Sequence, residues 1–536
     1  MNSDFIPFER TGYFSELICD YIDKKEGLKP FYNRFFNIEN FGEQLTEKAD
    51  RFSAADREIL YQALMEQYGK VDTSKKTQDH IKQLKEPITF TITTGHQLNL
   101  FTGPLYFLFK IASTIKLCKE LKQQYPKFNF VPVYWMATED HDFDEINHFN
   151  FKGKKLQWNK TASGAVGKLN TTGLNEVYRA FSNELGPGKN ADFLKDLFSK
   201  AYLENDTLTE ATRFLANTLF KSEGLVIIDG NHPHLKRLLM PFAKKDIFDS
   251  LGFSSVNASI EALRKLPGSY TVQVNPREIN YFYLADGVRE RIIADKDGFV
   301  VNDTDITFTK EELLLEMETS PERFSPNVIA RPLYQEVILP NLCYIGGGGE
   351  IAYWLELKAM FDAMEVPFPI LLLRNSAVLV SKKQALKAEK LNVALEDLFL
   401  KRHRLINKKI REISNIDIDF TPQKEHLETQ FKALYDLATK TDPSFLGAVK
   451  AQEAKQKKGL DKLEKRLLKA QKRTLKDQVV RITDLQNQLF PNRSLQERTQ
   501  NFSELYLALG DALVPSLMAA FEPLKSEFAI LRYDSL

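Results

Sequence analysis

Two strongly apolar segments with a helical segment between them constrain the fold of this chain more than any other feature. Residues 88–94, ITFTITT, and residues 128–137, FNFVPVYWMA, are rich in the β-branched and aromatic residues that favour strands. Residues 105–126, LYFLFKIASTIKLCKELKQQYP, have the length and composition of a helix. Strand, helix and strand in this order predict a β-α-β unit with parallel strands and a right-handed crossover.

Two further segments have the character of buried strands that end in polar residues. They are GLVIIDGNHP at 224–233 and FPILLLRNS at 368–376. We therefore expect an α/β fold whose core is a doubly wound parallel sheet. Ligands bind beyond the carboxyl ends of the strands in such sheets, so the loops after residues 94, 137 and 373 should meet in one cleft.

The rest of the chain predicts additions to this core. We assign residues 1–376 to the core with N-terminal helices, and residues 150–325 to an α+β insertion within it, made of hairpins and a meander of antiparallel strands. Residues 377–500 are helical and highly charged, and apolar residues at three-four spacing, with one phase shift near 471–475, predict a coiled coil. Residues 501–536 should form helices that pack back on the core.

Composition indicates the cellular compartment of the chain and the classes of partner that it binds. The formal net charge of +1 gives no field that favours nucleic acid or a membrane surface. Three scattered cysteines without a C-x-x-C pair suit a reducing compartment. Since no signal peptide and no apolar run long enough to span a bilayer is evident, we expect a cytoplasmic protein that binds neither nucleic acid nor membranes.

The most unusual segment is WMATEDHDFDEINH at 135–148, where an apolar strand leads into a cluster of acids and histidines. Such a cluster could bind a divalent metal, hold an amine, or raise the pKa of one carboxyl group so that it acts as a base. The segment contains no H-E-x-x-H motif, so we favour recognition of an amine and predict no metal. A capped loop with solvated acids is the structural alternative.

Three other segments could bind ligands. GHQLNLFTGP at 95–104 lies between a strand and a helix start, where backbone N–H groups favour anions, although it matches neither a dinucleotide nor a Walker motif. SPNVIARPLYQ at 325–335 precedes YIGGGGEIAYWLELK at 344–358, whose four glycines permit close approach of a ligand. Arg374 ends the last core strand and could bind a carboxylate or phosphate. A plain turn, a glycine-rich linker and a structural ion pair are the respective alternatives.

Taken together and in this order, TGHQLNLFTGPLY, EDHDFDEINH, FSPNVIARPLYQ, YIGGGGEIAYW and PILLLRNS resemble the family of cysteine-adding ligases of bacillithiol biosynthesis. The resemblance covers most of the chain. It implies a Rossmann-like core similar to class I aminoacyl-tRNA synthetases, with connective insertions and a coiled coil that pairs two protomers as a homodimer. It also implies a ligase that joins cysteine to the amine of glucosaminyl malate and so forms bacillithiol.

The resemblance and the motifs together suggest roles for the candidate residues. The catalytic candidates are His96, Asp140, His141 and Asp142, the last three binding and deprotonating the amine. The substrate-binding candidates are Thr94, Gly95, Gln97, Asn99, Gly103, Glu139, Glu145, Asn327, Arg331, Tyr344, Gly347, Gly348, Glu350, Tyr353, Trp354, Arg374, Asn375 and Ser376. In this scheme the loop at 95–104 holds phosphate or carboxylate, the two arginines clamp carboxylates, and the glycine segment with Trp354 closes the cleft.

The activating donor stays open at this stage. ATP could activate the carboxyl group, which would make the protein nucleotide-binding, but the motifs do not select it over another donor. Two alternative functions also remain: a metal-dependent hydrolase that uses the acid and histidine cluster at 139–148 to activate water, and a non-enzymatic coiled-coil scaffold.

Overall fold

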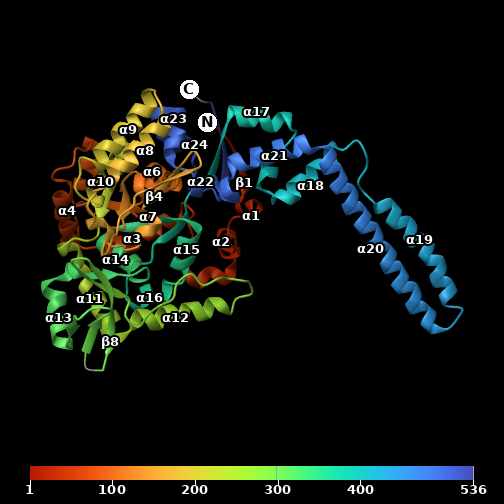
Figure 1. Cartoon of the computed structure of the whole chain (residues 1–536). Helices are drawn as coiled ribbons and strands as arrows, with labels where there is room; N and C mark the ends of the chain where they lie inside the picture. Colours follow the sequence, from red (N-terminus) through yellow and green to blue (C-terminus); the bar gives the residue numbers. More distant parts are fainter. Residues whose placement is uncertain (297, 535–536) are drawn as a thin grey trace. The chain divides into compact units, whose positions relative to one another are not determined.

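A computed structural model describes residues 1–296 and 298–534 of the chain (Figure 1). Helices dominate the N-terminal part, as predicted. The helices before the first core strand are α1 (Phe8–Thr11), α2 (Glu16–Ile22), α3 (Asn40–Arg51), α4 (Ala54–Tyr68) and α5 (Lys75–Gln83). None of the helices in the described residues is both long and apolar enough to cross a membrane.

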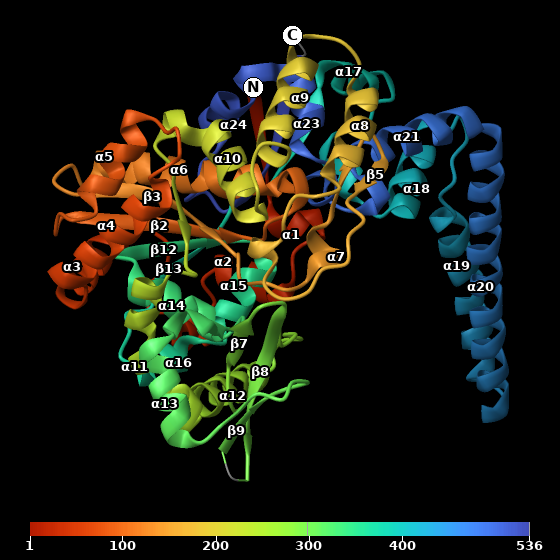
Figure 2. The same ribbon diagram turned by 60° about the vertical axis from the view of Figure 1, so that its left-hand side comes forward.

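The core is a parallel sheet of five strands in the order β13-β12-β2-β3-β6. Figure 2 shows β3, β2, β12 and β13 in one layer. Their bounds are β13 (Ile370–Leu373), β12 (Asn341–Gly346), β2 (Thr89–His96), β3 (Asn129–Met136) and β6 (Val226–Asp229). Helix α6 (Tyr106–Gln124) links β2 to β3 and packs on both. Every neighbouring pair is parallel, which confirms the predicted sheet and its β-α-β unit.

Strand β12 was not predicted, although it lies next to β2 near the middle of the sheet. Its apolar run, residues 342–345, is only four residues long and leads directly into four glycines. A run this short does not distinguish a strand from a loop by periodicity. The omission matters because the glycine segment therefore leaves the carboxyl end of a core strand, as the loops after β2 and β3 do.

The inserted region contains helices and two antiparallel sheets, which confirms the predicted hairpins and meander. A hairpin of β4 (His148–Phe151) and β5 (Lys154–Gln157) follows the acidic segment and its short helix α7 (Phe143–Ile146). The helices are α8 (Leu174–Leu185), α9 (Lys189–Tyr202), α10 (Leu208–Phe220), α11 (Pro233–Asp249), α12 (Leu251–Arg264) and α13 (Lys310–Thr319). The meander has the order β10-β9-β8-β7-β11, with β7 (Tyr281–Ala285), β8 (Val288–Asp295), β9 (Gly298–Val301), β10 (Thr307–Phe308) and β11 (Phe324–Pro326).

Three helices follow the meander and lie near the core strands. They are α14 (Ala330–Ile338), α15 (Gly348–Leu355) and α16 (Lys358–Ala363). Helix α15 begins inside the glycine segment, so its first turn lies at the carboxyl end of β12.

The chain termini form a sheet that the sequence analysis missed. Strand β1 (Asn2–Pro7) pairs antiparallel with β15 (Glu527–Tyr533), and β15 also neighbours β14 (Ala377–Ser381). Residues 501–536 were expected to be helical throughout. They contain α23 (Phe502–Leu509) and α24 (Leu513–Ala520), after α22 (Gln496–Thr499), but they end in this strand. Its partner lies at the opposite end of the sequence, where local patterns carry no information about pairing.

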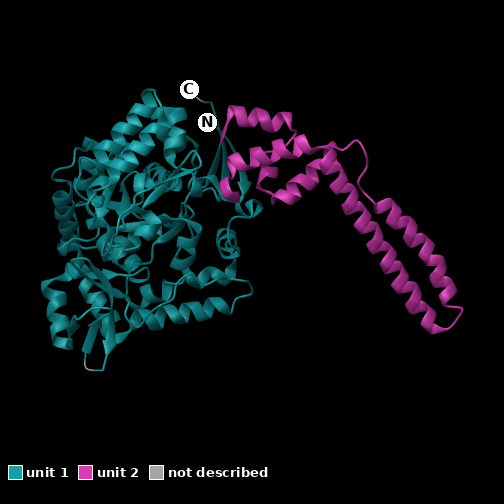
Figure 3. Cartoon of the chain, in the orientation of Figure 1, with its two compact units in different colours: residues 1–379, 494–536 teal, residues 380–493 magenta. Residues whose placement is uncertain are grey.

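The chain divides into two compact units, residues 1–379 with 494–536 and residues 380–493 (Figure 3). The second unit is helical. It comprises α17 (Lys382–Lys390), α18 (Arg402–Ile413), α19 (Thr421–Ala438), α20 (Pro443–Thr474) and α21 (Lys476–Leu489). Helices α19 and α20 form an antiparallel hairpin that buries Phe431, Ala438 and Val449. The predicted phase shift near 471–475 coincides with the break between α20 and α21 at Leu475.

Candidate functional site

A cavity of about 440 Å³ lies at the carboxyl ends of the core strands. His96 ends β2, Asp140 follows β3 and Arg374 follows β13, and all three side chains line this cavity. The predicted convergence of the loops after residues 94, 137 and 373 is therefore confirmed. The glycine segment after β12 lines the same cavity, as do residues from the inserted meander.

The cavity brings together most of the residues that the sequence singled out. Those that line it are Gly95, His96, Gln97, Glu139, Asp140, Asn327, Arg331, Tyr344, Gly347, Gly348, Glu350, Tyr353 and Arg374. Asn99, Gly103 and Glu145 line a second cavity, to which Gln97 also contributes. Thr94, His141, Asp142, Trp354, Asn375 and Ser376 line neither of these two cavities.

These six residues make structural contacts close to the main cavity. Thr94 Oγ1 donates to the Ile345 carbonyl over 2.7 Å and so joins β2 to β12. Trp354 is fully buried and stacks on Tyr344 with 4.5 Å between ring centroids, so it supports the cavity wall from behind rather than closing the opening. Asp142 caps α7 by accepting from the Glu145 N–H. Ser376 accepts from Arg374, and Asn375 accepts from Ser113.

The loop after β2 has an unusual backbone that places its polar residues beside the cavities. Phe101, Thr102 and Gly103 all have positive φ angles, of 48°, 67° and 62°. The Phe101 side chain is fully buried among other aromatic rings and anchors the loop. Asn501 Nδ2 donates to the carbonyls of Phe101 and Gly103, over 2.8 and 2.6 Å. A bend that α6 alone could not impose is therefore held by the C-terminal part of the same unit.

Asp140 is the acidic residue that is best placed to meet a ligand. Gln97 Nε2 donates to its Oδ2 over 2.9 Å, and the His141 backbone N–H donates to its Oδ1 over 2.7 Å. Burial by itself raises the pKa of Asp140, but the hydrogen bonds from His141 and Gln97 and the charge of Arg289 outweigh it. The resulting pKa lies well below its ordinary value, so Asp140 is a carboxylate at any physiological pH.

The neighbouring acids have other partners. Glu139 forms an ion pair with Lys236, whose side chain is completely buried and also donates to the Phe324 carbonyl over 2.6 Å. Glu145 accepts from Gln97 over 2.9 Å on the side of the second cavity. In the described residues, no group of three or more histidine, cysteine or acidic side chains is arranged to hold a metal ion. The acidic segment therefore gives a metal-dependent hydrolase no geometric support.

His96 is buried and uncharged. Burial, followed by the positive charge of Lys110, lowers its pKa from 6.5 to about 3. Its ring packs against Tyr106 and Phe107, with centroids 5.4 and 5.1 Å away. The Nε2 atom has no hydrogen-bond partner among the residues that the structure describes. A buried nitrogen without a partner in a cavity wall is available to a ligand.

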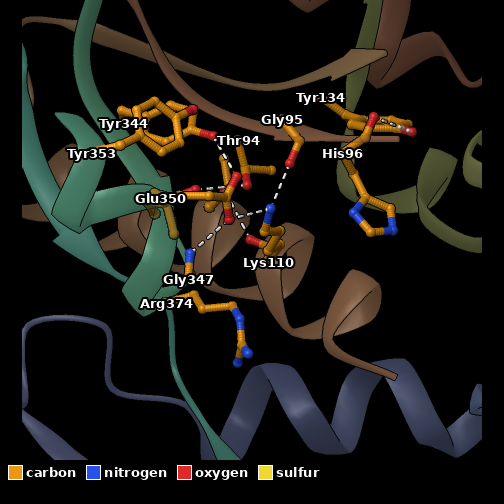
Figure 4. Close-up of polar contacts among 12 residues, drawn as sticks. Thr94, Gly95, His96, Lys110, Tyr134, Tyr344, Gly347, Glu350, Tyr353 and Arg374 are labelled. Carbon is orange, nitrogen blue, oxygen red and sulfur yellow. Dashed lines mark hydrogen bonds and ion pairs between the residues drawn. The ribbon is translucent and has the colours of Figure 1, made fainter. Parts of the chain in front are cut away.

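A charged network around Lys110 forms part of the cavity wall (Figure 4). The sequence analysis did not predict this network. Lys110 Nζ is 2.6 Å from the Gly95 carbonyl and 2.6 Å from Glu350 Oε2. Glu350 also accepts from the Tyr344 hydroxyl over 2.7 Å and from the Gly347 N–H over 2.8 Å. Burial raises the pKa of Glu350, but Lys110 lowers it overall. Lys110 lies within the apolar segment LYFLFKIAS. A lysine in such a segment was the signal that could have revealed the ion pair with Glu350.

Four arginines line the main cavity, two of them not predicted. Arg331 Nη1 donates to Gln335 over 3.1 Å, and Arg374 Nη2 pairs with Glu497 over 2.7 Å. The buried Nε of Arg374 has no partner among the described residues. Arg289, from β8 of the meander, donates to His141 Nδ1 over 2.7 Å. Neither Arg289 nor Arg498 stands in a segment with a recognisable motif, so only the fold could bring them to the site.

Fold and cavity together define a Rossmann-like protein with a candidate small-molecule site. Acidic and arginine side chains share one concave site at the strand ends, where such folds bind ligands.

Comparison with known proteins identifies the family. The chain matches the bacillithiol biosynthesis BshC N-terminal Rossmann-like domain over residues 1–375 and the BshC C-terminal coiled-coil domain over residues 377–533. The chain therefore belongs to the BshC family of bacillithiol biosynthesis, a family of ligases. Both matched domains agree with the fold described above.

Relatives cover nearly the whole chain. A protein of Flavobacterium johnsoniae named "Putative cysteine ligase BshC" is 57% identical over 531 residues, which are 99% of this chain and 100% of the relative. Proteins of the same name from Cytophaga hutchinsonii and Bacillus cereus are 36% and 28% identical, covering 99% and 90% of this chain and 98% and 92% of their own lengths. A crystal structure of a "putative arginyl t-RNA synthetase" from Campylobacter jejuni matches with 11% identity and a TM-score of 0.23, covering 85% of this chain and 100% of the synthetase chain. A likeness at that level supports no inference.

Proposed function

We propose that this protein joins the carboxyl group of cysteine to the amine of glucosaminyl malate and so forms the amide bond of bacillithiol. The observation that carries the proposal is the cavity at the strand ends, in which an ionised Asp140 and several arginines face one space. Glucosaminyl malate carries an ammonium group and two carboxylates, which match these two kinds of side chain. The names of the relatives supply cysteine as the second substrate.

In this proposal Asp140 binds the ammonium group of the sugar. A carboxylate whose pKa lies far below its usual range is a strong hydrogen-bond acceptor and a poor base. Asp140 therefore orients the amine and does not itself remove the proton. Gln97 and the His141 backbone hold the carboxylate in place through their hydrogen bonds.

His96 is the candidate acceptor of the amine proton. It is neutral and lines the main cavity, and its Nε2 has no partner among the described residues. Two protons must leave the ammonium group: the first is lost to water before the neutral amine attacks, and His96 takes the second, because the nitrogen becomes strongly acidic once it has bonded to the carbonyl carbon. His141 and Asp142 then act as positioning residues, the first through Asp140 and Arg289 and the second as the cap of α7.

The arginines are the candidate partners of the malate carboxylates. Arg331 and Arg374 come from different elements, α14 and the end of β13, yet line one cavity. A planar guanidinium suits a carboxylate because its N–H groups can meet the oxygens. Arg374 can offer only its Nε, because its Nη1 donates to Asn375 and Ser376 and its Nη2 pairs with Glu497, so Arg331 is the main candidate for a malate carboxylate. The glycine segment leaves room for such a ligand, since its backbone forms part of the cavity wall without side chains.

We propose ATP as the donor for activation of the carboxyl group. ATP supplies this activation when it is bound. The residues at the start of α15 fit a phosphate group. The Nε of Arg374 is buried without a partner in the described chain and lies 3.8 Å from the position that a Cβ of Gly347 would occupy. The following N–H groups of Gly348 and Gly349 belong to the first turn of α15, which favours anions.

We also propose that two copies associate through the hairpin of α19 and α20 in a reducing cytoplasm. Leu437 and Leu463 of this hairpin are 54% and 51% exposed, more than a monomeric hairpin requires. The three cysteines are free, as a reducing compartment favours. Light scattering of the purified protein should show a dimer, and Leu463→Glu should weaken it; a wild-type monomer would reject the association.

The function is tested by supplying the purified protein with cysteine, glucosaminyl malate and ATP and measuring thiol products by mass spectrometry. We expect bacillithiol in the complete mixture and none without the protein. Cells that lack the gene should lose bacillithiol and accumulate glucosaminyl malate. Normal bacillithiol in those cells would reject the proposal, and product formation without ATP would reject the nucleotide alone.

A further inference from the structure

A second cavity of about 270 Å³ adjoins the main one and has no role in the reaction as described so far. Gln97, Tyr106 and Arg498 line both cavities and so form their common boundary. On the far side of this boundary the wall consists of the loop after β2, the acidic segment and the first residues of β4. It contains Asn99, Gly103, Pro104, Glu145, His148, Phe149, Asn150 and Thr499. The volume lies near the lower end of small-molecule sites, roughly 300 Å³.

The polar groups of the second cavity suit a small zwitterion. Arg498 supplies an exposed guanidinium at the boundary of the cavity. Glu145 supplies a carboxylate, and Asn99 supplies a side-chain oxygen that is buried and unpartnered within the described chain. Asn99 is 8% exposed, so its oxygen depends on a ligand or water in the cavity for a hydrogen bond.

The two cavities are linked through one side chain. Gln97 Nε2 donates to Asp140 Oδ2 over 2.9 Å and to Glu145 Oε2 over 2.9 Å. One amide group thus fixes the carboxylate of the main cavity and the carboxylate of the second cavity at the same time. Ligands that bind these two carboxylates therefore lie on either side of the Gln97 side chain.

We propose that the second cavity binds L-cysteine, an inference that rests on the proposed function. Arg498 binds the carboxylate at the boundary, and Glu145 with the Asn99 oxygen binds the ammonium group. The side chain then lies against Phe149 and His148, apolar and uncharged groups that accept a thiol; burial lowers the pKa of His148, which keeps its ring neutral. This orientation directs the carboxyl group of cysteine toward the main cavity, where the sugar amine is held.

The test is the affinity for L-cysteine of the purified full chain, measured by isothermal titration with and without saturating glucosaminyl malate. Glu145→Gln removes the charge that would bind the ammonium group, and Arg498→Gln removes the partner of the carboxylate. Each should weaken cysteine about tenfold or more, as expected for loss of a charge-assisted hydrogen bond. Glu145→Gln should leave the affinity for glucosaminyl malate unchanged. Cysteamine, which lacks the carboxylate, should bind weakly to the wild type.

Asp144→Asn is the matched control. It removes the same charge from the neighbouring residue, whose side chain lines neither cavity and accepts a hydrogen bond from Asn147. It should bind cysteine as the wild type does, and thermal unfolding should show that all three variants are folded.

Two results would overturn the subsite. One is wild-type affinity for cysteine in Glu145→Gln together with its loss in Asp140→Asn, which would place cysteine in the main cavity and leave the proposed function intact. The other is a wild type that binds no cysteine under either condition. If Glu145→Gln weakens cysteine but no bacillithiol is formed by the wild type, the subsite stands and the proposed ligase activity fails.

Discussion

Two carboxylates at the ends of neighbouring core strands show how one cavity combines structural and ligand-binding groups. Glu350, after β12, is paired with Lys110 and also accepts from Tyr344 and Gly347. Asp140, after β3, accepts from Gln97 and from the backbone N–H groups of His141 and Asp142, the last over 3.5 Å, so oxygen lone pairs remain for a ligand. Both are ionised, but Glu350 neutralises a cation of the protein, whereas Asp140 has no lysine or arginine within ion-pair distance in the described residues.

The comparison teaches that charge in a site is not itself evidence of a role in binding. A buried ion pair is costly to break because the remaining partner is left without compensation. Neutralising Asp140 also costs stability, because its hydrogen bonds and Arg289 favour the charged form, but it leaves no lysine or arginine of the described residues without an ion-pair partner. Variants that remove one charge from either residue separate the two roles.

The largest effect on stability is expected from Glu350→Gln. The substitution keeps an oxygen acceptor but leaves the Lys110 ammonium, which is 4% exposed, without its carboxylate. We expect the free energy of unfolding to fall by about 3 kcal/mol, as for other buried ion pairs that lose one partner. Denaturant unfolding measures this change in the free energy of unfolding. A fall below about 1 kcal/mol would show that Lys110 needs no partner.

Asp140→Asn, in contrast to Glu350→Gln, should affect activity more than stability. We expect turnover to fall about 100-fold, equivalent to about 2.7 kcal/mol, because the ammonium group loses a charged acceptor. Stability should fall as well, since the carboxylate is favoured by its hydrogen bonds and by Arg289, but by less than in Glu350→Gln, because asparagine keeps one oxygen for Gln97 and no buried lysine loses its partner. Product formation by mass spectrometry, with thermal unfolding as the control, measures both quantities. Full activity in this variant would remove Asp140 from the site.

His96 extends the comparison to a buried group whose Nε2 has no hydrogen-bond partner among the described residues. Its folded-state pKa of about 3 lies below the unfolded value of 6.5, so the unfolded chain binds a proton that the folded chain does not. The associated stability is fully present above pH 6.5 and is lost as the pH falls toward 3. Between pH 7 and pH 5 the loss is about 2 kcal/mol.

Denaturant unfolding of wild type and His96→Gln at both pH values isolates this contribution from the other histidines. The wild type should lose about 2 kcal/mol more than the variant between pH 7 and pH 5. Equal losses in the two proteins would mean that His96 is solvated or protonated in the folded state.

Gly103→Ala tests the backbone that carries the polar residues between the cavities. A Cβ at this position would lie 2.6 Å from Asn99 Cβ, and the φ angle of 62° is unfavourable for alanine. We expect a loss of about 1.5 kcal/mol in stability. Gly153→Ala is the control, because its φ angle of 77° is also positive but nothing lies within 4 Å of the added Cβ. Equal losses in both would show that the contact with Asn99 contributes nothing.

The sequence predicted the parts of the fold that are encoded locally. Long apolar strands such as β2 and β3 and the long helix between them have distinct patterns, and parallel strands place their following loops at one edge. Strand β12 was missed because its apolar run is short and merges with four glycines, and β1 and β15 because each depends on a partner at the other end of the chain.

The candidate site also contains residues that the local sequence could reveal and residues that only the fold brings together. Acidic and arginine residues next to strand ends could be found from the sequence, since their position follows from the strands. Two further lining residues could not, because Arg289 and Arg498 meet the cavity only through packing of distant elements. The separate roles of Asp140 and Glu350 depend on their hydrogen-bond and ion-pair partners and therefore needed the structure.

The most direct test of the central claim is titration of glucosaminyl malate and its N-acetyl derivative against wild type and Asp140→Asn. If Asp140 binds the ammonium group, the wild type should prefer the free amine by about tenfold or more, or about 1.4 kcal/mol. Asp140→Asn should bind the two compounds alike. An undiminished preference for the amine in Asp140→Asn would contradict the claim that this carboxylate recognises it.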